Sequence, residues 1–376
     1  MNSNVVPAPR REAARSDLLE RRLRRYHPRF QGAVRALATR HTRIADLAAS
    51  FPALLFALAV PRPRQDTAPA LARVLDGAPL AEVAAAAGVA LWLRRLPPES
   101  FAQPIPRLPD GALVRRQILN HLPRSPRRVL AWLQVVADMA ELSHEQGAVW
   151  IAREMMRAPL RVNPKRLRLL GLWIWFSGQT TAFGHGLIDK SWSPAMGIDA
   201  ALAAANDWRT EIALHVNLGA ESIADMWLQA GHAAGYDFLP LDSIASIASE
   251  AKAMKNCLRT YGYNLAHNRS RLWSVRRDGA RVATLRVAIR WKDPLLNVVE
   301  LEAADNTRAP REVWWAARQW LQTHDLSAVD TGVREWGRVP LVRATWLSLW
   351  RPYWLAKRRV PDWLPIAPSR DALEAL

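Results

Sequence analysis

The stretch RLWSVRRDGARVATLRVAI, residues 271–289, decides the fold class, because it is the clearest β-hairpin pattern in the chain. Both halves follow the two-residue period of a strand, and Asp278-Gly279 between them is a strong signal for a two-residue turn. In the second half, Thr284 and Arg286 share one face of the predicted strand. The opposite face carries the apolar residues Ala283, Leu285, Val287 and Ile289.

The segments on either side extend the hairpin into a larger unit. The run LLNVVELE at 295–302 follows a turn and predicts a third strand. Residues 241–266 before the hairpin read as one helix or two short ones, and residues 309–326 read as a closing helix. The sequence therefore predicts a small antiparallel three-stranded sheet packed by helices near the C-terminus.

Apolar residues elsewhere recur mainly at helical spacing, so we expect an α+β fold that is predominantly α-helical, with helical N-terminal and middle regions. One of these helices is predicted over 220–235, ending at Gly235. The expected segments are a basic arm (1–30), a helical N-terminal domain (31–165), a helical middle region (166–240), the α+β domain (241–326) and a Trp- and Arg-rich C-terminal segment (327–376).

The charge balance indicates a polyanionic partner. The 376 residues include 52 Lys and Arg against 34 Asp and Glu, a net charge of +18, and 46 of the basic residues are arginine. Arginine matches phosphate groups and stacks on bases, so nucleic acid or an anionic membrane surface is indicated. Coding bias toward arginine is the alternative, although it does not explain the excess over acids. The charge is uneven: residues 1–45 carry +8 and residues 171–250 carry −7.

Clusters of arginine are the candidate contacts to DNA or RNA phosphates. The candidates are Arg21, Arg22, Arg24, Arg25, Arg115, Arg116, Arg127, Arg128, Arg351, Arg358 and Arg359. Residues 78–101 fit a helix-turn-helix in which two short helices meet at Gly88. Arg94 and Arg95 lie near the end of the second helix. An ordinary pair of antiparallel helices is the favoured alternative, because a short turn with glycine is common to both and the second helix lacks Gln, Asn or Ser to reach base edges.

Tryptophans recur in the C-terminal segment at 341–364. Trp346, Trp350 and Trp354 are four residues apart and lie among arginines and lysines. They predict one of three roles: stacking on bases, lying at a membrane interface, or packing as one helix face against the main body.

One cysteine cannot form an internal disulfide, which fits a reducing cytoplasm. The longest apolar runs, at 53–60 and 169–176, are much shorter than the roughly 20 residues that a membrane-spanning helix needs. We therefore expect a soluble, cytoplasmic protein without a transmembrane segment.

Residues 250–322, about one fifth of the chain, contain Asn256, Cys257 and Tyr261 in the pattern Met-Lys-Asn-Cys-x3-Tyr. This segment resembles the PcfJ-like family, which has a Met/His-x-Asn-Cys-x3-Tyr element. Its strand pair falls on SVR at 274–276 and on Thr284, and its Asn before the last helix falls on Asn306, although EAADN replaces the Gly-rich approach to that Asn. The family is associated with conjugative plasmids, phages and other mobile elements, so the resemblance implies that context and partner proteins from such an element.

Two interpretations of the matched residues remain open. Cys257 with Asn306 could form a catalytic pair, with Lys255 or His267 generating the thiolate, or Cys257 could be a small buried apolar residue. The polar residues around them could form a ligand site or a buried hydrogen-bond network. These candidate binding residues are Asn256, Tyr261, Arg276 and Thr284.

Metal and cofactor chemistry has little support. Glu300, Glu302 and Asp305 could bind Mg²⁺, but acids on a strand more often pair with arginines, here Arg281 or Arg286. The spacing of His and Cys fits no zinc site, and no phosphate-binding glycine motif is present. We expect neither a metal nor a cofactor.

These observations favour a nucleic-acid-associated accessory protein of a mobile genetic element, binding mainly through arginine–phosphate contacts. A cysteine-dependent enzyme with a site around Cys257 and Asn306 is the first alternative, and a protein-interaction or structural module is the second.

Overall fold

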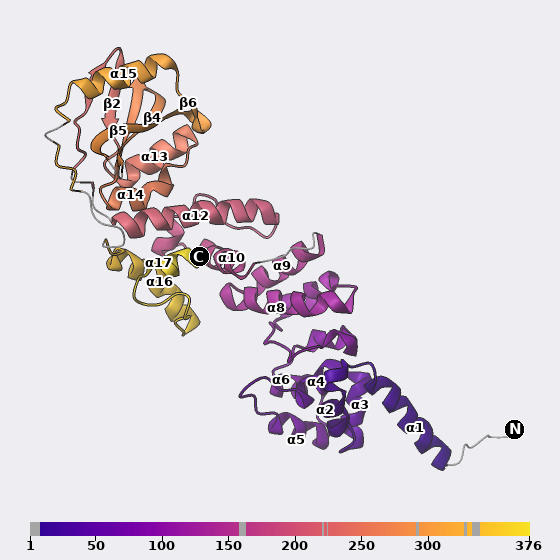
Figure 1. Ribbon diagram of the computed structural model, residues 1–376. Helices are drawn as coiled ribbons and strands as arrows, with labels where there is room; N and C mark the ends of the chain where they lie inside the picture. Colours follow the sequence, from indigo (N-terminus) through magenta and orange to yellow (C-terminus); the bar gives the residue numbers. More distant parts are fainter. Residues whose placement is uncertain are drawn as a thin grey trace. The chain divides into compact units, whose positions relative to one another are not determined.

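The computed structural model describes residues 8–157, 163–219, 222–223, 225–290, 293–326, 329–332 and 339–376, with side chains from residue 16 onward except 290 and 293–295. Parts of the expected basic arm and C-terminal segment therefore lie outside the described residues. The chain divides into two compact units, coloured along the sequence in Figure 1. The N-terminal unit comprises residues 1–175 and 192–201, and the C-terminal unit comprises residues 176–191 and 202–376.

The described part of the N-terminal unit is helical. Its helices are α1 (Ala8–Leu23), α2 (Pro28–Ala38), α3 (Thr42–Ser50), α4 (Pro52–Ala59), α5 (Ala68–Asp76), α6 (Leu80–Ala86), α7 (Ala112–Gln117), α8 (Pro126–Leu142), α9 (Glu145–Arg157) and most of α10 (Pro164–Ser177), with the 3₁₀ helices η1 (Leu91–Arg95), η2 (Pro98–Ser100) and η3 (Ile118–His121). The apolar run at 53–60 forms α4, which Pro52 starts and whose middle residues are all buried. It is a short core helix.

The end of α1 belongs to the core of this unit. Leu23 and Tyr26 are buried, and the Tyr26 ring stacks on Phe56 with centroids 6.3 Å apart. The Tyr26 hydroxyl also donates to the carbonyl of Pro52. Deleting residues 1–30 would therefore remove core contacts as well as charge.

The segment at 78–101 does not form a helix-turn-helix. Gly88, with φ +56°, ends α6 in the left-handed conformation that a helix C-terminus favours. The next element is η1, a 3₁₀ helix of five residues, which is too short to serve as a recognition helix. Trp92 within it is buried and donates to the carbonyl of Pro109, so packing sets the position of this segment.

The C-terminal unit combines helices with a sheet. Its helices are α11 (Phe183–Gly186), most of α12 (Ile198–Leu218), α13 (Ile244–Met254), α14 (Gly262–Ala266), α15 (Arg311–Gln322), α16 (Arg343–Lys357) and α17 (Arg370–Glu374), with the 3₁₀ helices η4 (Leu258–Tyr261) and η5 (Ala304–Asn306). Its strands are β1 (Gly231–Ala233), β2 (Tyr236–Pro240), β3 (Ser270–Arg277), β4 (Ala280–Arg290), β5 (Asp293–Ala303) and β6 (Thr307–Arg308).

The prediction of a small three-stranded sheet is wrong. Among the described residues the sheet has six antiparallel strands, which lie side by side in sequence order from β1 to β6. The predicted strands are its centre, β3 to β5, and Asp278-Gly279 forms the expected turn with φ of +52° and +79°. The predominantly helical character of the chain is confirmed for the described residues.

The strands missed by the sequence prediction lie at or near the edges. Residues 231–240 form a second hairpin, whose turn is Ala234-Gly235 with φ of +50° and +81°. The helix predicted over 220–235 is therefore wrong for this part. The sequence was misleading because alanine rarely adopts a positive φ and because the preceding residues have apolar spacing that also fits a helix. Strand β6 has two residues, too few to produce a period.

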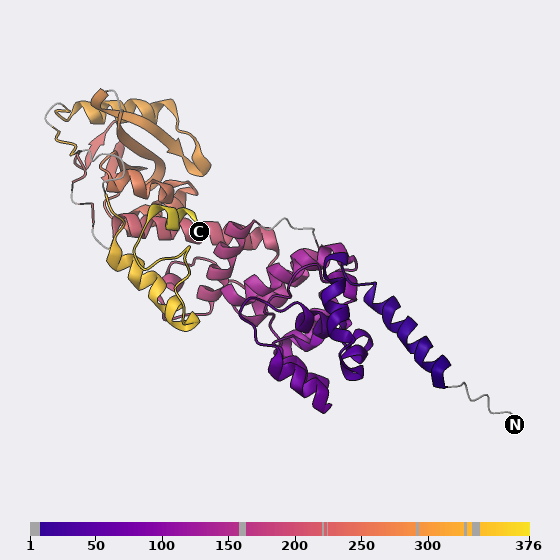
Figure 2. The same cartoon turned by 60° about the horizontal axis from the view of Figure 1, so that its bottom comes forward.

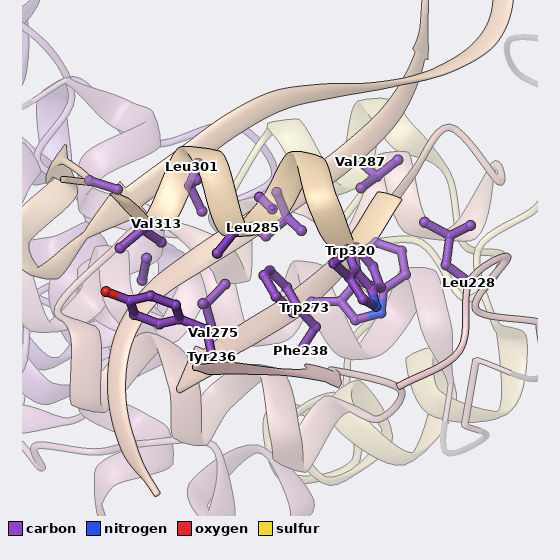
Figure 3. Packing of buried hydrophobic residues seen from close by; sticks show 14 of the residues in the cluster. Leu228, Tyr236, Phe238, Trp273, Val275, Leu285, Val287, Leu301, Val313 and Trp320 are labelled. Atoms are coloured by element: carbon purple, nitrogen blue, oxygen red, sulfur yellow. The ribbon is translucent and has the colours of Figure 1, made fainter. Parts of the chain in front are cut away.

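Different helices cover the two faces of the sheet. On one face, α15 packs over a buried apolar cluster centred on Phe238, Trp273 and Trp320, drawn in Figure 3. On the other face, α13, η4 and α14 pack through a second cluster that includes Leu258 and Leu272. Figures 1 and 2 show α15 on the side of the sheet away from α13 and α14.

The C-terminal tryptophans pack inside the unit. Trp346, Trp350 and Trp354 on α16 are all buried, and the Trp350 ring lies 5.7 Å from Phe176 and 6.1 Å from Trp208. The packing interpretation of this stripe is therefore confirmed, and these rings cannot stack on bases. Within the described part of the chain, no helix has both the length and the apolar character needed to cross a bilayer.

Candidate functional site

The register of the central strands gathers polar side chains on the face under α13. Thr284 on β4 lies between Ser274 on β3 and Glu302 on β5. One step along the same face, Arg286 is opposite Glu300. Because residues two apart share a face, these two rows form one continuous polar surface within an otherwise apolar sheet.

The segment after α13 carries the matched motif onto this surface. A capping box between Ser243 and Ser246 starts α13, and Lys255 ends it in the left-handed conformation with φ +49°. The chain thus turns back toward the sheet, where Nδ2 of Asn256 donates to Oγ1 of Thr284 at 3.1 Å. This bond attaches the motif to the centre of the sheet.

An ion pair between a buried carboxylate and an exposed arginine extends this network. The side chain of Glu250, on the last turns of α13, is fully buried, and its Oε2 accepts from Nε of Arg281 at 2.8 Å. The other carboxylate oxygen faces the hydroxyl of Thr284 at 3.3 Å. Thr284 therefore donates to Glu250 and accepts from Asn256, which satisfies both functions of its hydroxyl.

Tyr261 adds a second set of contacts to the polar cluster formed by Asn256, Thr284, Glu250 and Arg281. Its hydroxyl donates to Oε2 of Glu300 at 2.5 Å, and Arg286 pairs with Oε1 of the same carboxylate at 3.1 Å. The Arg286 guanidinium also lies over the Tyr261 ring, 4.5 Å from its centroid. Burial, and next the hydrogen bond to Glu300, raise the pKa of Tyr261, so its hydroxyl stays protonated as a donor.

Of the three acidic residues considered as Mg²⁺ ligands, pairing explains Glu300. Glu300 is bound by Arg286 and Tyr261, as the pairing interpretation predicts. Desolvation and the neighbouring Glu300 charge raise the pKa of Glu302, and Asp305 lies in the exposed turn η5. Within the described ranges, no group of three His, Cys, Asp or Glu residues is placed to hold a metal ion.

Five of the six motif residues proposed from the sequence come together. They line one small pocket, and they are Asn256, Cys257, Tyr261, Thr284 and Asn306. The sixth, Arg276, does not line it, and its Nε donates to the hydroxyl of Ser274 at 3.2 Å. The sequence analysis missed the roles of Glu250, and it gave Arg286 and Glu300 only as an ion pair.

The thiol of Cys257 is exposed, so the interpretation of Cys257 as a buried apolar residue is wrong. His267 is buried elsewhere, with Nδ1 bonded to the carbonyl of Tyr263 and Nε2 facing Arg370 at 3.2 Å. It is therefore not the base that a thiolate mechanism would need at Cys257. The pocket has a volume of about 10 Å³, room for no more than one water molecule. The cluster joins η4 to the sheet through the bond between Tyr261 and Glu300.

We expect the Tyr261→Phe substitution to lower the free energy of unfolding by about 1.5–3 kcal/mol, the range for a hydrogen bond to a charged group. The Cys257→Ala substitution removes an exposed side chain next to the same cluster and should change it by no more than about 0.5 kcal/mol. Urea unfolding of the full chain measures both variants. A larger loss for Cys257→Ala than for Tyr261→Phe would contradict the structural role assigned to the cluster.

The second candidate site is an arginine-lined pocket in the N-terminal unit. Its volume is about 300 Å³, and four arginines line it: Arg22, Arg25, Arg94 and Arg95. Glu99 holds Arg25 through two hydrogen bonds of 2.7 and 3.3 Å, and the carbonyl of Ser50 accepts from Nε of Arg94 at 2.7 Å. The side chains of Arg22 and Arg95 have no hydrogen-bond or ion-pair partner among the residues that the structure describes.

The other proposed phosphate contacts are distributed over both units. Of the eleven arginines proposed, all are exposed except Arg22, which is half-buried. Arg115 is paired with Asp110 at 2.8 Å. Arg351 and Arg358 belong to the C-terminal unit and do not line the pocket of Arg22 and Arg25. Arg94 and Arg95 were identified from the sequence only as part of a helix-turn-helix, yet they reach the same pocket from η1.

Comparisons of the chain with known protein families, with curated proteins and with solved structures give no match.

Proposed function

We propose that the protein binds nucleic acid through arginine–phosphate contacts made by its N-terminal unit. The observation that carries this proposal is the pocket at which Arg22, Arg25, Arg94 and Arg95 converge. Glu99 balances the charge of Arg25, so the guanidinium groups of Arg22, Arg94 and Arg95 around the same concave surface still require an anion to balance their charge. A phosphate group meets that requirement, and arginine binds it in a bidentate manner.

The distribution of charge supports the same unit. The N-terminal unit contains 28 basic and 14 acidic side chains, a net charge of +14. The C-terminal unit contains 24 basic and 20 acidic side chains, a net charge of +4. Uniform coding bias would raise the arginine content of both units without concentrating the excess positive charge in one. A localised positive surface is typical of proteins that bind polyanions.

The pocket combines positioned and free guanidinium groups. Arg25 and Arg94 are held by Glu99 and by a backbone carbonyl, so their orientation costs little additional entropy on binding. Arg22 and Arg95 keep their donors for a ligand. The resemblance of residues 250–322 to PcfJ-like sequences adds a context: we propose that the nucleic acid, DNA or RNA, belongs to a mobile genetic element and that proteins of that element are the partners.

The test is the salt dependence of binding. We expect the full chain to bind a labelled DNA duplex at low salt, with an affinity that falls steeply as salt rises because bound counterions are released. The double substitution Arg22→Ala with Arg95→Ala should reduce the slope of log affinity against log salt by about 2, close to one for each arginine that no longer neutralises a phosphate. Fluorescence anisotropy titrations at several salt concentrations give both slopes.

A matched control removes the same charge elsewhere in the unit. Arg40 and Arg73 are exposed, and neither lines the pocket, so Arg40→Ala with Arg73→Ala should leave the slope nearly unchanged. Titrations with single-stranded RNA of equal length show which nucleic acid is preferred. Absence of binding at low salt, or equal slopes for the two double variants, would contradict the proposal.

A further inference from the structure

A larger pocket lies in the C-terminal unit, apart from the polar cluster at Cys257. It has a volume of about 710 Å³, which is within the range of small-molecule sites. Residues from α11 and the loop after it, the last turns of α12, α13 between Ile244 and Lys252, η4 and α16 line it. None of the residues in the motif at 256–257 lines this pocket, so the two sites are separate.

One wall of the pocket is apolar and includes an aromatic ring. Phe183 is 40% exposed although it is large and apolar, and Leu187, Ile188 and Ile244 continue the same wall. The Phe183 ring makes an edge contact with His215, with centroids 5.7 Å apart and planes at 72°. An exposed aromatic ring in a concave site is a suitable surface for stacking a planar ligand.

The lining of the pocket also includes hydrogen-bond acceptors. The side chain of Glu211 is only 13% exposed, and its Oε1 pairs with Arg259 at 3.1 Å. Its Oε2 is 3.9 Å from Nδ1 of His215, beyond hydrogen-bond distance. Burial raises the pKa of Glu211 despite the arginine, as expected for a carboxylate with too few donors around it.

His215 adds a second acceptor one helical turn away. Its Nδ1 lies 2.9 Å from the carbonyl oxygen of Glu211 and must carry the proton, because a carbonyl can only accept. With the proton on Nδ1, the uncharged form of the ring presents Nε2 as an acceptor. At the rim, Asp189 pairs with Lys252 at 2.9 Å, which joins the α11 loop to α13 and cancels both charges.

We propose that this pocket binds a nucleobase whose edge offers adjacent N–H donors, with guanine the best match. The base stacks on Phe183, its exocyclic amine donates to the Glu211 carboxylate, and its N1–H donates to Nε2 of His215. The apolar wall favours a planar ring, and the two acceptors favour a ligand with two donors on one edge. The balanced ion pairs favour a ligand without charge. This proposed site is additional to the phosphate contacts of the N-terminal unit, and the proposal does not depend on those contacts.

Guanosine is the probe, because it lacks a phosphate and so does not report on the arginine-lined pocket. Isothermal titration of the full chain with guanosine should show binding. Inosine lacks the exocyclic amine and should bind about tenfold more weakly, the loss expected for one hydrogen bond to a charged group. Glu211→Gln replaces one acceptor oxygen by a donor and should remove the preference for guanosine over inosine.

Gly186 allows the pocket itself to be blocked. It lines the pocket, and a Cβ added there would meet no atom within 4 Å, so Gly186→Leu adds a side chain at the pocket from a position where the backbone has room for one. Gly32, in α2, has the same freedom in the other unit, so Gly32→Leu is the matched control. Gly186→Leu should abolish guanosine binding and Gly32→Leu should preserve it.

Each outcome decides the proposal. Binding that is lost in Gly186→Leu, and preferred over inosine in the wild type, supports it. Absence of guanosine binding overturns it, as does binding that Gly186→Leu leaves intact. Equal binding of guanosine, inosine and uridine also overturns it, because the pocket would then hold a planar ring without reading its edge. None of these results affects the test of the arginine pocket.

Discussion

Replacing Trp320 by alanine is expected to lower the free energy of unfolding by about 3–5 kcal/mol, the range for truncating a large buried aromatic residue. Trp320 lies fully buried on α15 at the centre of the apolar face of the sheet (Figure 3). Its ring stacks on Phe238 with centroids 4.7 Å apart and planes at 5°, and Trp273 packs against it at 5.4 Å. The substitution opens a cavity between α15, β2 and β3.

The same helix supplies the control. Trp315 is 57% exposed, so Trp315→Ala removes a side chain of the same size with an expected change of no more than about 0.5 kcal/mol. Urea unfolding of the full chain compares the two variants. Equal losses would show that α15 does not pack on the sheet through Trp320.

Gly231 offers an independent check of this packing. A Cβ at this position would lie 2.8 Å from Nε1 of Trp320, closer than real Cβ atoms approach. The absence of a side chain on β1 is therefore what lets the indole ring reach its place under the edge hairpin. Sequence alone offers no reason for glycine at this position, because the requirement comes from a residue 89 positions later.

A strand of this sheet could be predicted from the sequence where it pairs with the next strand across a turn that the sequence specifies. The centre was predictable because β3 and β4 are long and joined by Asp278-Gly279, a turn that the sequence itself specifies. The hairpin of β1 and β2 depends on pairing with β3, as Phe238 does with Val275, and its Ala234-Gly235 turn has no strong signal. Tertiary pairing therefore overrides a local pattern that fits a helix.

The polar cluster shows the same limit at the level of side chains. The spacing of the motif indicated that Asn256, Cys257 and Tyr261 belong together, and the structure places them around one pocket. Their partners could not be read from spacing, because the hydrogen bond of Asn256 with Thr284 spans 28 residues and that of Tyr261 with Glu300 spans 39. The register of β4 and β5 places Glu300 beside Arg286, where Tyr261 reaches it. It is the same register that places charged residues beneath α13.

The second large loss of stability is expected when the buried carboxylate of Glu250 loses its ion-pair partner. Arg281→Ala removes the guanidinium that lies 2.8 Å from a fully buried charge, so we expect it to lower the free energy of unfolding by about 3–5 kcal/mol. An exposed arginine of α15 serves as the control, and Arg318→Ala should change the stability by no more than about 0.5 kcal/mol. Urea unfolding of the full chain measures both.

A second substitution separates the uncompensated charge from the loss of arginine packing. Glu250→Gln removes the buried charge but keeps an oxygen that can accept from Thr284, whose hydroxyl lies 3.3 Å from the carboxylate. Combined with Arg281→Ala, it should restore most of the lost stability, because no unpaired charge then remains beneath α13. The pair of substitutions must therefore be strongly non-additive. Additive losses, or an Arg281→Ala variant as stable as Arg318→Ala, would show that Glu250 is solvated in the folded protein and that the ion pair does not join α13 to the sheet.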